Sequence, residues 1–392
     1  MAYSNNHFVP RLVLRRYNDR LSVFNIKTGV LKENNKLENI FSEQNLYDED
    51  IEIMLGQNVE SPFANILTNK ILKAEVSDEI ELTRKELNII KKFLLTEQMR
   101  VFINEGKYSA LEKYLTAFQK ASGAKYPFEE KVIEEETVEA RWQRNLRVIV
   151  ECSDLMHIQE HELCTYEIYR WAQIYNSGYL AIWDSSSCRE DFIVSDIGMT
   201  SEVEPSFVKI GLEVEKKDYL LKALQSAKKV SEKELYFGLL NSQMNFHENF
   251  YMFSISKNRM IVIINPFFRL YSNRQYAEEV KVPKPDIWPT EITDKALFAK
   301  NRSQQLPIVF GKPVLNENDK FWYKVLPMKF DDVVWVNMLM LDRIDTYLGF
   351  SDMENIADSV FNYVDYHKQK KLAAPKNYEP LLKIMKDKNI IE

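Results

Sequence analysis

The stretch Asn6–Tyr17, NHFVPRLVLRRY, stands near the start of the chain and sets a proline and three arginines among apolar residues. Pro10 fixes φ and has no N–H to donate, so it suits the first turn of a helix. A helix that begins there places Leu14 and Tyr17 on one face, where they can pack against a core. The stretch therefore predicts an amphipathic N-terminal helix.

His7 lies just before this predicted helix, and Arg11 and Arg15 stand within it, four residues apart. Free N–H groups and the positive end of the helix dipole favour an anion such as phosphate at this position. Arginine side chains are suited to the same ligand. The residues thus predict an anion site, and a surface helix with a structural histidine is the competing interpretation.

Patterning beyond this stretch predicts a mainly helical N-terminal half with one hairpin. Leu21–Ile26 alternates and the pattern resumes at Val30–Leu31, with Gly29 able to supply a positive φ, which indicates a β-hairpin. Apolar residues then recur at helical spacing over residues 48–73 and again over Thr83–Asn104.

The C-terminal half mixes strand and helix patterns. Tyr251–Ile255 and Met260–Ile264 are typical of a second hairpin, and Phe321–Leu326 is a further predicted strand. Ser351 and Glu354 have the spacing of a capping box, which predicts the start of the last helix. Helical spacing also covers residues 134–175, 218–230 and 331–348. We therefore expect an α+β fold whose C-terminal half has a small, mostly antiparallel sheet packed by helices.

Breaks in the pattern at Ser122-Gly123 and Tyr126-Pro127 indicate a subdomain joint. The expected division is an N-terminal hairpin and helical subdomain, residues 1–125, and a C-terminal α+β subdomain, residues 126–392. One continuous domain over both parts is left open.

Composition bounds the class of protein. The chain has 392 residues, 45% of them hydrophobic, so a sizeable core is possible. Its net charge of −6 does not favour generic nucleic-acid binding, although residues 1–36 carry seven Lys or Arg against two acids. The 3 Cys form no CxxC pair, the first residues lack the unbroken apolar run typical of a signal peptide, and no apolar run reaches membrane length. We expect a soluble, cytoplasmic protein with no membrane partner.

The first half of the chain contains a series of short, different sequence elements in a recognisable order. The first is His7-Phe8-Val9-Pro10 with Leu14, Arg15 and Tyr17 behind it. The others are the hairpin LSVFNIKTGVL, SEQNLYD with Glu43 and Tyr47, Glu60 on a helix, EQMR with Gln98 and Arg100, and FIVSDIG with Ser195 and Asp196. In this order the chain resembles domain-of-unknown-function family 4238. It departs from the family at Gly198, where the family has Pro, and in the closer spacing of Gln98 and Arg100. The resemblance implies a fold family and no particular reaction.

The candidate catalytic residues come from separate elements and are His7, Arg11, Arg15, Glu43, Gln98 and Asp196, with Glu60 and Arg100 as further polar groups. A histidine, carboxylates and arginines in one cleft suffice for acid–base cleavage of a phosphodiester. We therefore expect a metal-independent phosphodiester-cleaving enzyme without a cofactor, such as an RNase-like toxin or phage-defence effector. A non-catalytic module that binds nucleic acid, a nucleotide or another ligand stays open, as does a polar network that only braces the fold.

A separate motif, His157-Ile158-Gln159-Glu160-His161, has the H-x-x-E-H spacing of inverted zincins. Two histidines four residues apart on one helix face can chelate zinc, and Glu232 or Glu234 could add a ligand. The flanking residues are polar, which is typical of an exposed helix. A zinc metalloprotease is thus a further alternative, and a solvated helix face is the competing interpretation.

Overall fold

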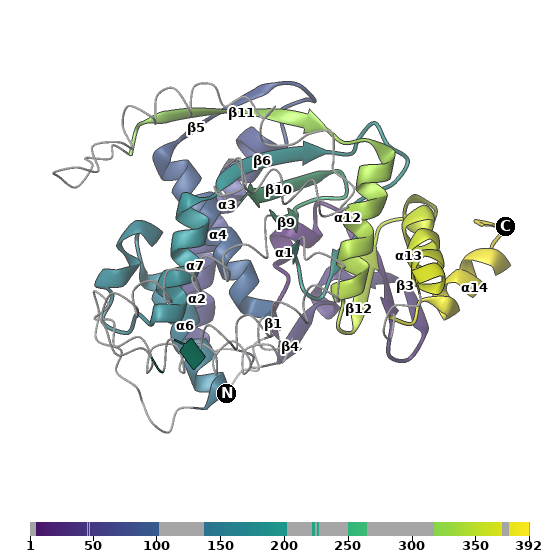
Figure 1. Ribbon diagram of the computed structural model, residues 1–392, viewed down its shortest axis with the longest axis horizontal. Coiled ribbons are helices and arrows are strands. Elements are labelled where there is room, and N and C mark those ends of the chain that lie inside the picture. The colour runs from purple at the N-terminus through teal and green to yellow at the C-terminus, as the bar shows by residue number, and fades with distance from the viewer. Residues whose placement is uncertain are drawn as a thin grey trace.

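The structure is a computed structural model that describes residues 5–44, 46, 48–101, 137–201, 222–223, 226, 250–264, 317–370 and 376–391. The predicted joint near residue 125 lies outside these residues, as do Tyr47, Glu232, Glu234 and most of the helix predicted over 218–230. Helices and mostly antiparallel sheets together confirm the α+β fold (Figure 1).

The N-terminal part begins with short elements that fold against one another. They are β1 (Asn5–His7), α1 (Arg11–Leu14), β2 (Arg20–Asn25), β3 (Val30–Lys36), η1 (Leu37–Asn39) and β4 (Ser42–Gln44). The predicted hairpin is confirmed, because β2 and β3 pair antiparallel and Gly29 has a φ of +68°. Pro10 precedes α1 and its buried Leu14, as predicted, but α1 is a single turn of 4 residues. So short a helix has only a small dipole, which contributes little at its end, and the anion site at His7 and Arg11 stays a prediction.

A helical layer follows and includes the amphipathic helix predicted from Thr83. Its elements are α2 (Glu49–Leu55), η2 (Gly56–Glu60), α3 (Ser61–Ile66), η3 (Leu67–Ile71), α4 (Arg84–Val101), α6 (Val138–Glu151), η4 (Leu155–Glu160) and α7 (Tyr166–Ser177). The C-terminal helices are α12 (Phe330–Arg343), η6 (Glu354–Ile356), α13 (Ala357–Lys370) and α14 (Glu379–Asp387).

The largest sheet has six strands and lies between these two groups of helices (Figure 1). Its order is β5 (Glu79–Thr83), β11 (Lys320–Pro327), β6 (Tyr179–Asp184), β10 (Arg259–Ile264), β9 (Phe250–Ser254) and β8 (Thr200–Ser201). The β9–β10 hairpin was predicted from sequence and pairs Ile261 with Phe253. The β11–β6 pair is parallel.

Strand alternation supplies both sides of this sheet with core residues. On β10, Ile261 and Ile263 pack with the N-terminal helical layer, whereas Val262 and Ile264 pack with α12, α13 and α14. Successive side chains point to opposite faces, so a strand buried on both faces must be apolar throughout. The run MIVII meets this requirement.

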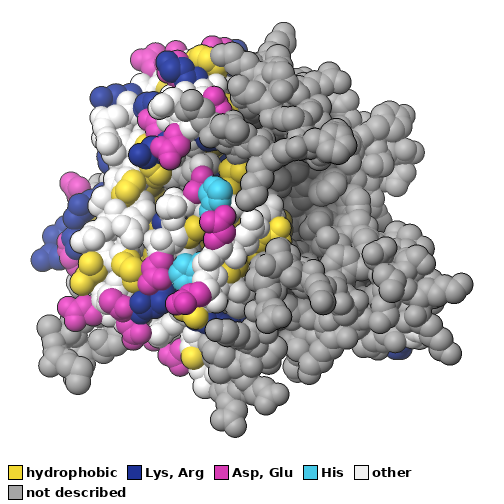
Figure 2. Space-filling model, turned by 90° about the vertical axis from the view of Figure 1, so that its left-hand side faces the viewer, with side chains coloured by type: hydrophobic (Ala, Val, Ile, Leu, Met, Phe, Trp, Pro, Cys, Tyr) yellow, Lys and Arg dark blue, Asp and Glu magenta, His cyan; other side chains and the backbone are white. Residues whose placement is uncertain are grey.

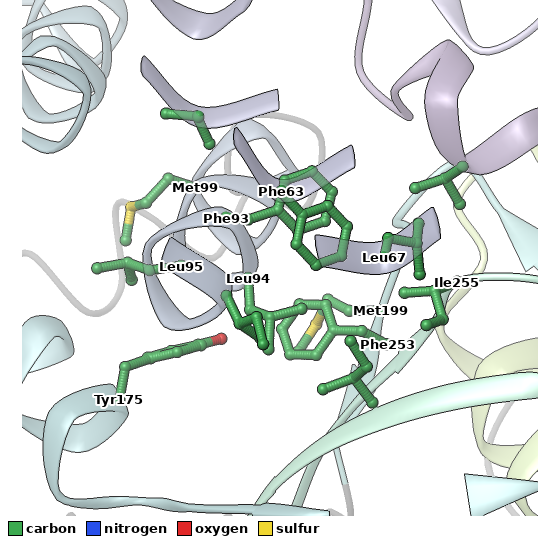
Figure 3. Packing of buried hydrophobic residues seen from close by; sticks show 14 of the residues in the cluster. Phe63, Leu67, Phe93, Leu94, Leu95, Met99, Tyr175, Met199, Phe253 and Ile255 are labelled. Carbon is green, nitrogen blue, oxygen red and sulfur yellow. The ribbon is translucent and has the colours of Figure 1, made fainter. Parts of the chain in front are cut away.

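Aromatic stacking ties the helical layer together (Figure 3). Phe63 of α3 stacks on Phe93 of α4, with ring centroids 3.7 Å apart and planes 9° from parallel. Leu94 and Phe253 lie below this pair, which joins the helices to β9. The packing holds α3 and α4 at a fixed separation, and the candidate site described below depends on that separation.

A second sheet joins distant parts of the chain in the order β3, β2, β12 (Tyr347–Phe350) and β7 (Val194–Ser195). The N-terminal hairpin therefore pairs with a strand close to the C-terminus. Both larger sheets take strands from either side of residue 125. This pairing favours the interpretation of one continuous domain over two subdomains, and the division itself stays a prediction.

Two details of the C-terminal prediction are wrong. The helix expected over residues 331–348 ends at Arg343, and Tyr347–Phe350 form β12 instead. Ser351 does not cap a helix, because its hydroxyl donates to the carbonyl of Tyr17 at 2.9 Å. The N–H of Glu354 is bound by the Asp352 side chain. In both places a contact with a distant segment overrides the local signal.

Gly349 lies on β12 between β2 and β7, and we expect Gly349→Ala to destabilise the protein. A Cβ there would lie 2.7 Å from Val194 Cγ1 and 2.8 Å from Phe41 Cζ. Overpacking of this kind costs about 1–3 kcal/mol. Denaturant unfolding measures it, with Gly56→Ala as the matched control, since that Cβ meets nothing within 4 Å. Equal unfolding midpoints for the two variants would contradict the close approach at Gly349.

Candidate acid–base site

His7 stands on the ribbon formed by β1 and β4. Asn6 pairs with Glu43 and His7 with Ser42 across this ribbon. Because side chains alternate along a strand, His7 shares a face with Ser42, while Glu43 lies on the other face with Asn6. Asn6 is fully buried, and its side-chain oxygen accepts from the N–H of Leu46 at 2.9 Å. This bond fixes the start of the chain beside β4.

Glu60 comes from a helix that contains two wide turns. The chain stays helical from α2 through η3, but η2 and η3 are π turns. A π turn accommodates an extra residue within a helix and is frequent at functional sites. Glu60 is the last residue of the first one, and from there its side chain reaches Arg100 of α4.

Arg100 lies near the end of α4, and its side chain is only 1% exposed. Its Nη1 donates to Glu97 Oε1 at 3.0 Å, one turn earlier in the same helix, and its Nη2 donates to Glu60 Oε1 at 2.5 Å. A guanidinium taken out of water requires such partners, since an unpaired buried ion is strongly destabilising. The fork of Arg100 therefore fixes Glu60 relative to α4.

The charges around Arg100 also act on His7. Burial and the charge of Arg11 lower the pKa of His7, and Arg100 acts in the same direction. The hydrogen bond to the Ile40 backbone and the Glu60 carboxylate oppose this, but the net direction is down. The lowered pKa of His7 favours the neutral imidazole, which can accept a proton.

Two more carboxyl groups complete the cluster. Burial raises the pKa of Glu97 to about 8, although the charge of Arg100 acts to lower it. Burial also raises the pKa of Glu52, which is hydrogen-bonded to Asn6 and lies near Arg100 and Glu60. Three carboxyl groups thus surround a single buried guanidinium. We call the following residues the His7 cluster: His7, Arg11, Glu52, Glu60, Glu97 and Arg100.

Of the six residues predicted as catalytic, His7 and Arg11 belong to this cluster. Arg11 also donates to Glu38 at 3.0 Å on the partly exposed rim. Arg15 is exposed and lies near the same Glu38. Glu43 is exposed on the face of the ribbon opposite to His7. Arg15 and Glu43 are thus close to the cluster in the chain but do not point into it.

Gln98 and Asp196 have other partners. Gln98 is buried and accepts a hydrogen bond from the hydroxyl of Tyr175 on α7. Asp196 accepts from three backbone N–H groups at the start of β12, those of Asp345, Thr346 and Tyr347. Burial raises the pKa of Asp196 to about 6 even though these N–H groups lower it. Of the six predicted residues, the structure therefore brings only His7 and Arg11 together, and the other four lie or point elsewhere.

Glu52 and Glu97 were missed by sequence reasoning. Glu97 and Arg100 are three residues apart on α4, which is the spacing of an intrahelical ion pair and could have indicated their contact. Gln98 is one position further round the helix and so faces α7 instead. No local signal marks Glu52, which is one of several acids in α2.

The H-x-x-E-H motif lies on the face shown in Figure 2, where imidazoles stand among acidic side chains. It was expected on one face of an α-helix, but η4 is a 3₁₀ helix, and His161 follows its last residue. His157 pairs with Glu160 at 3.1 Å, whereas His161 pairs with Glu151 at 2.9 Å. The two rings have different carboxylate partners, so the expected chelating geometry is absent from this motif.

Within the described ranges of the chain, no group of three or more His, Cys, Asp or Glu could hold a metal ion. No helix within the same ranges is both long enough and apolar enough to cross a bilayer.

Comparison with known proteins supports the resemblance seen in the sequence. A family model described as a protein of unknown function, DUF4238, matches residues 5–282, which is more than half of the chain. No curated protein and no solved structure matches the chain. The chain therefore belongs to the DUF4238 family.

Proposed function

We propose that the protein is an enzyme that cleaves phosphodiester bonds by general acid–base catalysis, with His7 moving the proton. The observation that carries this proposal is the setting of His7. A half-buried imidazole with a lowered pKa lies under the influence of two guanidinium groups and one carboxylate. These are the groups that proton transfer at a phosphate requires.

Each group has a role in the proposed reaction. Neutral His7 accepts the proton of the attacking hydroxyl, while the oxygen of that hydroxyl forms a bond to phosphorus. The bond between phosphorus and the leaving oxygen breaks, and that oxygen receives a proton from the His7 imidazolium. Glu60 stabilises the imidazolium, and Arg11 on the rim stabilises the charge on the phosphate oxygens. RNA carries its own attacking hydroxyl and is the first substrate to test.

One observation favours a second candidate, a non-catalytic binding module. Arg11 and Arg100 already have carboxylate partners in Glu38, Glu60 and Glu97. These carboxylates already neutralise both guanidinium groups, which leaves less positive charge to stabilise a transition state than catalysis requires. The module would bind an oligonucleotide or a nucleotide without turning it over.

Turnover distinguishes the two candidates. The full chain is incubated with end-labelled single-stranded RNA and with DNA of the same sequence, in EDTA. We expect cleavage by the unmodified protein and a drop of about 100-fold or more for His7→Ala, because a general acid–base group typically contributes 10²–10⁴-fold. The melting temperature of His7→Ala should be close to that of the unmodified protein.

His157→Ala is the matched control, since His157 is an exposed imidazole that pairs only with Glu160 among the described residues. It should retain full activity. If the unmodified protein cleaves neither polymer but binds RNA, and His7→Ala weakens the binding, the module is the correct interpretation. Full activity in His7→Ala would remove His7 from the reaction.

A further inference from the structure

We infer that Glu97 is a positioning residue: its carboxyl group stays neutral, holds the Arg100 fork in place and leaves Glu60 as the carboxylate that faces His7. The roles of His7 and Glu60 in this inference rest on the proposed function. The protonation of Glu97 and its effect on the geometry do not, and they can be tested in a protein that cleaves nothing.

Geometry is the first support. Arg100 donates one nitrogen to Glu97 and the other to Glu60, so the two carboxyl groups occupy the two ends of a single guanidinium. The side chain of Glu97 is 6% exposed and that of Arg100 is 1% exposed, whereas that of Glu60 is 27% exposed. The buried guanidinium thus joins a buried carboxyl group, that of Glu97, to a partly exposed one, that of Glu60.

Charge is the second support. Glu52, Glu60 and Glu97 would together carry three negative charges beside one guanidinium, in a region largely removed from water. Burial penalises the charged form most where water is furthest away, so the innermost carboxyl group should keep its proton. Among the residues that the structure describes, the charged groups that act on Glu97 are Arg100 from its own helix and Glu60 from η2. Burial outweighs the attraction of Arg100, and the pKa of Glu97 is raised to about 8.

A neutral Glu97 leaves one ionised carboxylate, that of Glu60, bound to the Arg100 fork. The carbonyl oxygen of Glu97 still accepts from Nη1. The other end of the fork is thereby fixed, and so is the Glu60 carboxylate that it holds. Loss of this acceptor would let the guanidinium rotate and would release Glu60 from its place near His7.

Two variants test the inference. Glu97→Gln preserves the shape, the acceptor oxygen and the neutral charge, so we expect its activity to stay within twofold of the unmodified protein. Glu97→Leu removes the acceptor, and we expect kcat to fall about tenfold or more with little change in KM, since a misplaced proton-transfer partner affects the chemical step.

The titration of His7, followed by NMR and assigned with His7→Ala, is a readout that needs no turnover. Glu97→Gln should leave its midpoint unchanged. Glu60→Gln should lower the midpoint, because the Glu60 carboxylate raises the pKa of His7. A Glu97→Gln protein whose His7 midpoint shifts as far as that of Glu60→Gln would show that Glu97 is ionised and would overturn the inference.

Stability against pH gives a third readout. The folded chain keeps a proton on Glu97 up to about pH 8, whereas an unfolded Glu releases it near 4.5. The folded state therefore binds more protons in this window, and the unmodified protein loses stability as pH rises through it. Glu97→Gln should lack this part of the loss. If the titrations and this pH profile behave as expected while no substrate is cleaved, the positioning role stands and the proposed function fails.

Discussion

Arg100→Met is expected to lower the free energy of unfolding by about 3–5 kcal/mol, which is typical of breaking a buried ion pair by removing one partner. The Arg100 side chain is almost completely buried, and its fork binds carboxyl groups from α4 and η2. Methionine fills a similar volume but offers no donor. The Glu60 carboxylate would then have to be hydrated by water in place of Arg100, and the buried oxygen of Glu97 would lose its hydrogen-bond donor. Urea unfolding followed by circular dichroism measures the change.

Two further variants separate charge from geometry at this position. Arg100→Lys keeps the charge but cannot bind two carboxyl groups through a planar fork, so we expect roughly half the loss. Combining Arg100→Met with Glu97→Leu removes both buried polar groups and should recover part of the stability, as replacement of a whole buried pair by apolar residues often does. A loss below about 1 kcal/mol in Arg100→Met would contradict the contacts of the fork, given the usual size of such effects.

Local sequence signals predicted the elements whose conformation depends on residues close in sequence. Gly29 marked the first hairpin, because a positive φ is easy for glycine, and the apolar run at 260–264 marked β10. The short strands β1, β4 and β8 carry no comparable pattern, since pairing with a distant segment defines them. β12 was hidden for the same reason, and its Gly349 fits against Phe41 and Val194.

Site residues could be predicted only where a local sequence pattern marks them. His7 and Arg11 were found because their spacing around Pro10 is distinctive. Glu97 was passed over for its neighbour Gln98, because a sequence does not show which face of α4 meets η2. The packing of Phe63 on Phe93 decides that face, and it is a tertiary contact. Protonation depends on burial, so the neutral state of Glu97 could not be read from the chain at all.

Asp196 was predicted as a catalytic residue because it is polar and follows an apolar run, but its carboxylate binds backbone N–H groups. Asp196→Ala is expected to lower the free energy of unfolding by about 2–4 kcal/mol, because the buried N–H groups of Asp345, Thr346 and Tyr347 lose their acceptor. These groups start β12, so the junction between the N-terminal hairpin and the C-terminus should weaken first. Hydrogen exchange at Thr346 and Tyr347 measures that weakening directly.

Asp196→Asn is the matched control, because its amide oxygen can still accept from some of the three N–H groups. Its loss in free energy of unfolding should be about half that of Asp196→Ala.

The stabilities of the unmodified protein and of Asp196→Asn should also depend differently on pH. The pKa of Asp196 is raised from 3.8 to about 6 in the folded chain, so the unmodified protein loses stability as pH rises between these values, and Asp196→Asn lacks that loss. The difference between the two should therefore be larger at pH 4 than at pH 7. If Asp196→Ala instead kept its stability and lost phosphodiester cleavage, Asp196 would act on the substrate, and the backbone contacts at the start of β12 would not be its main role.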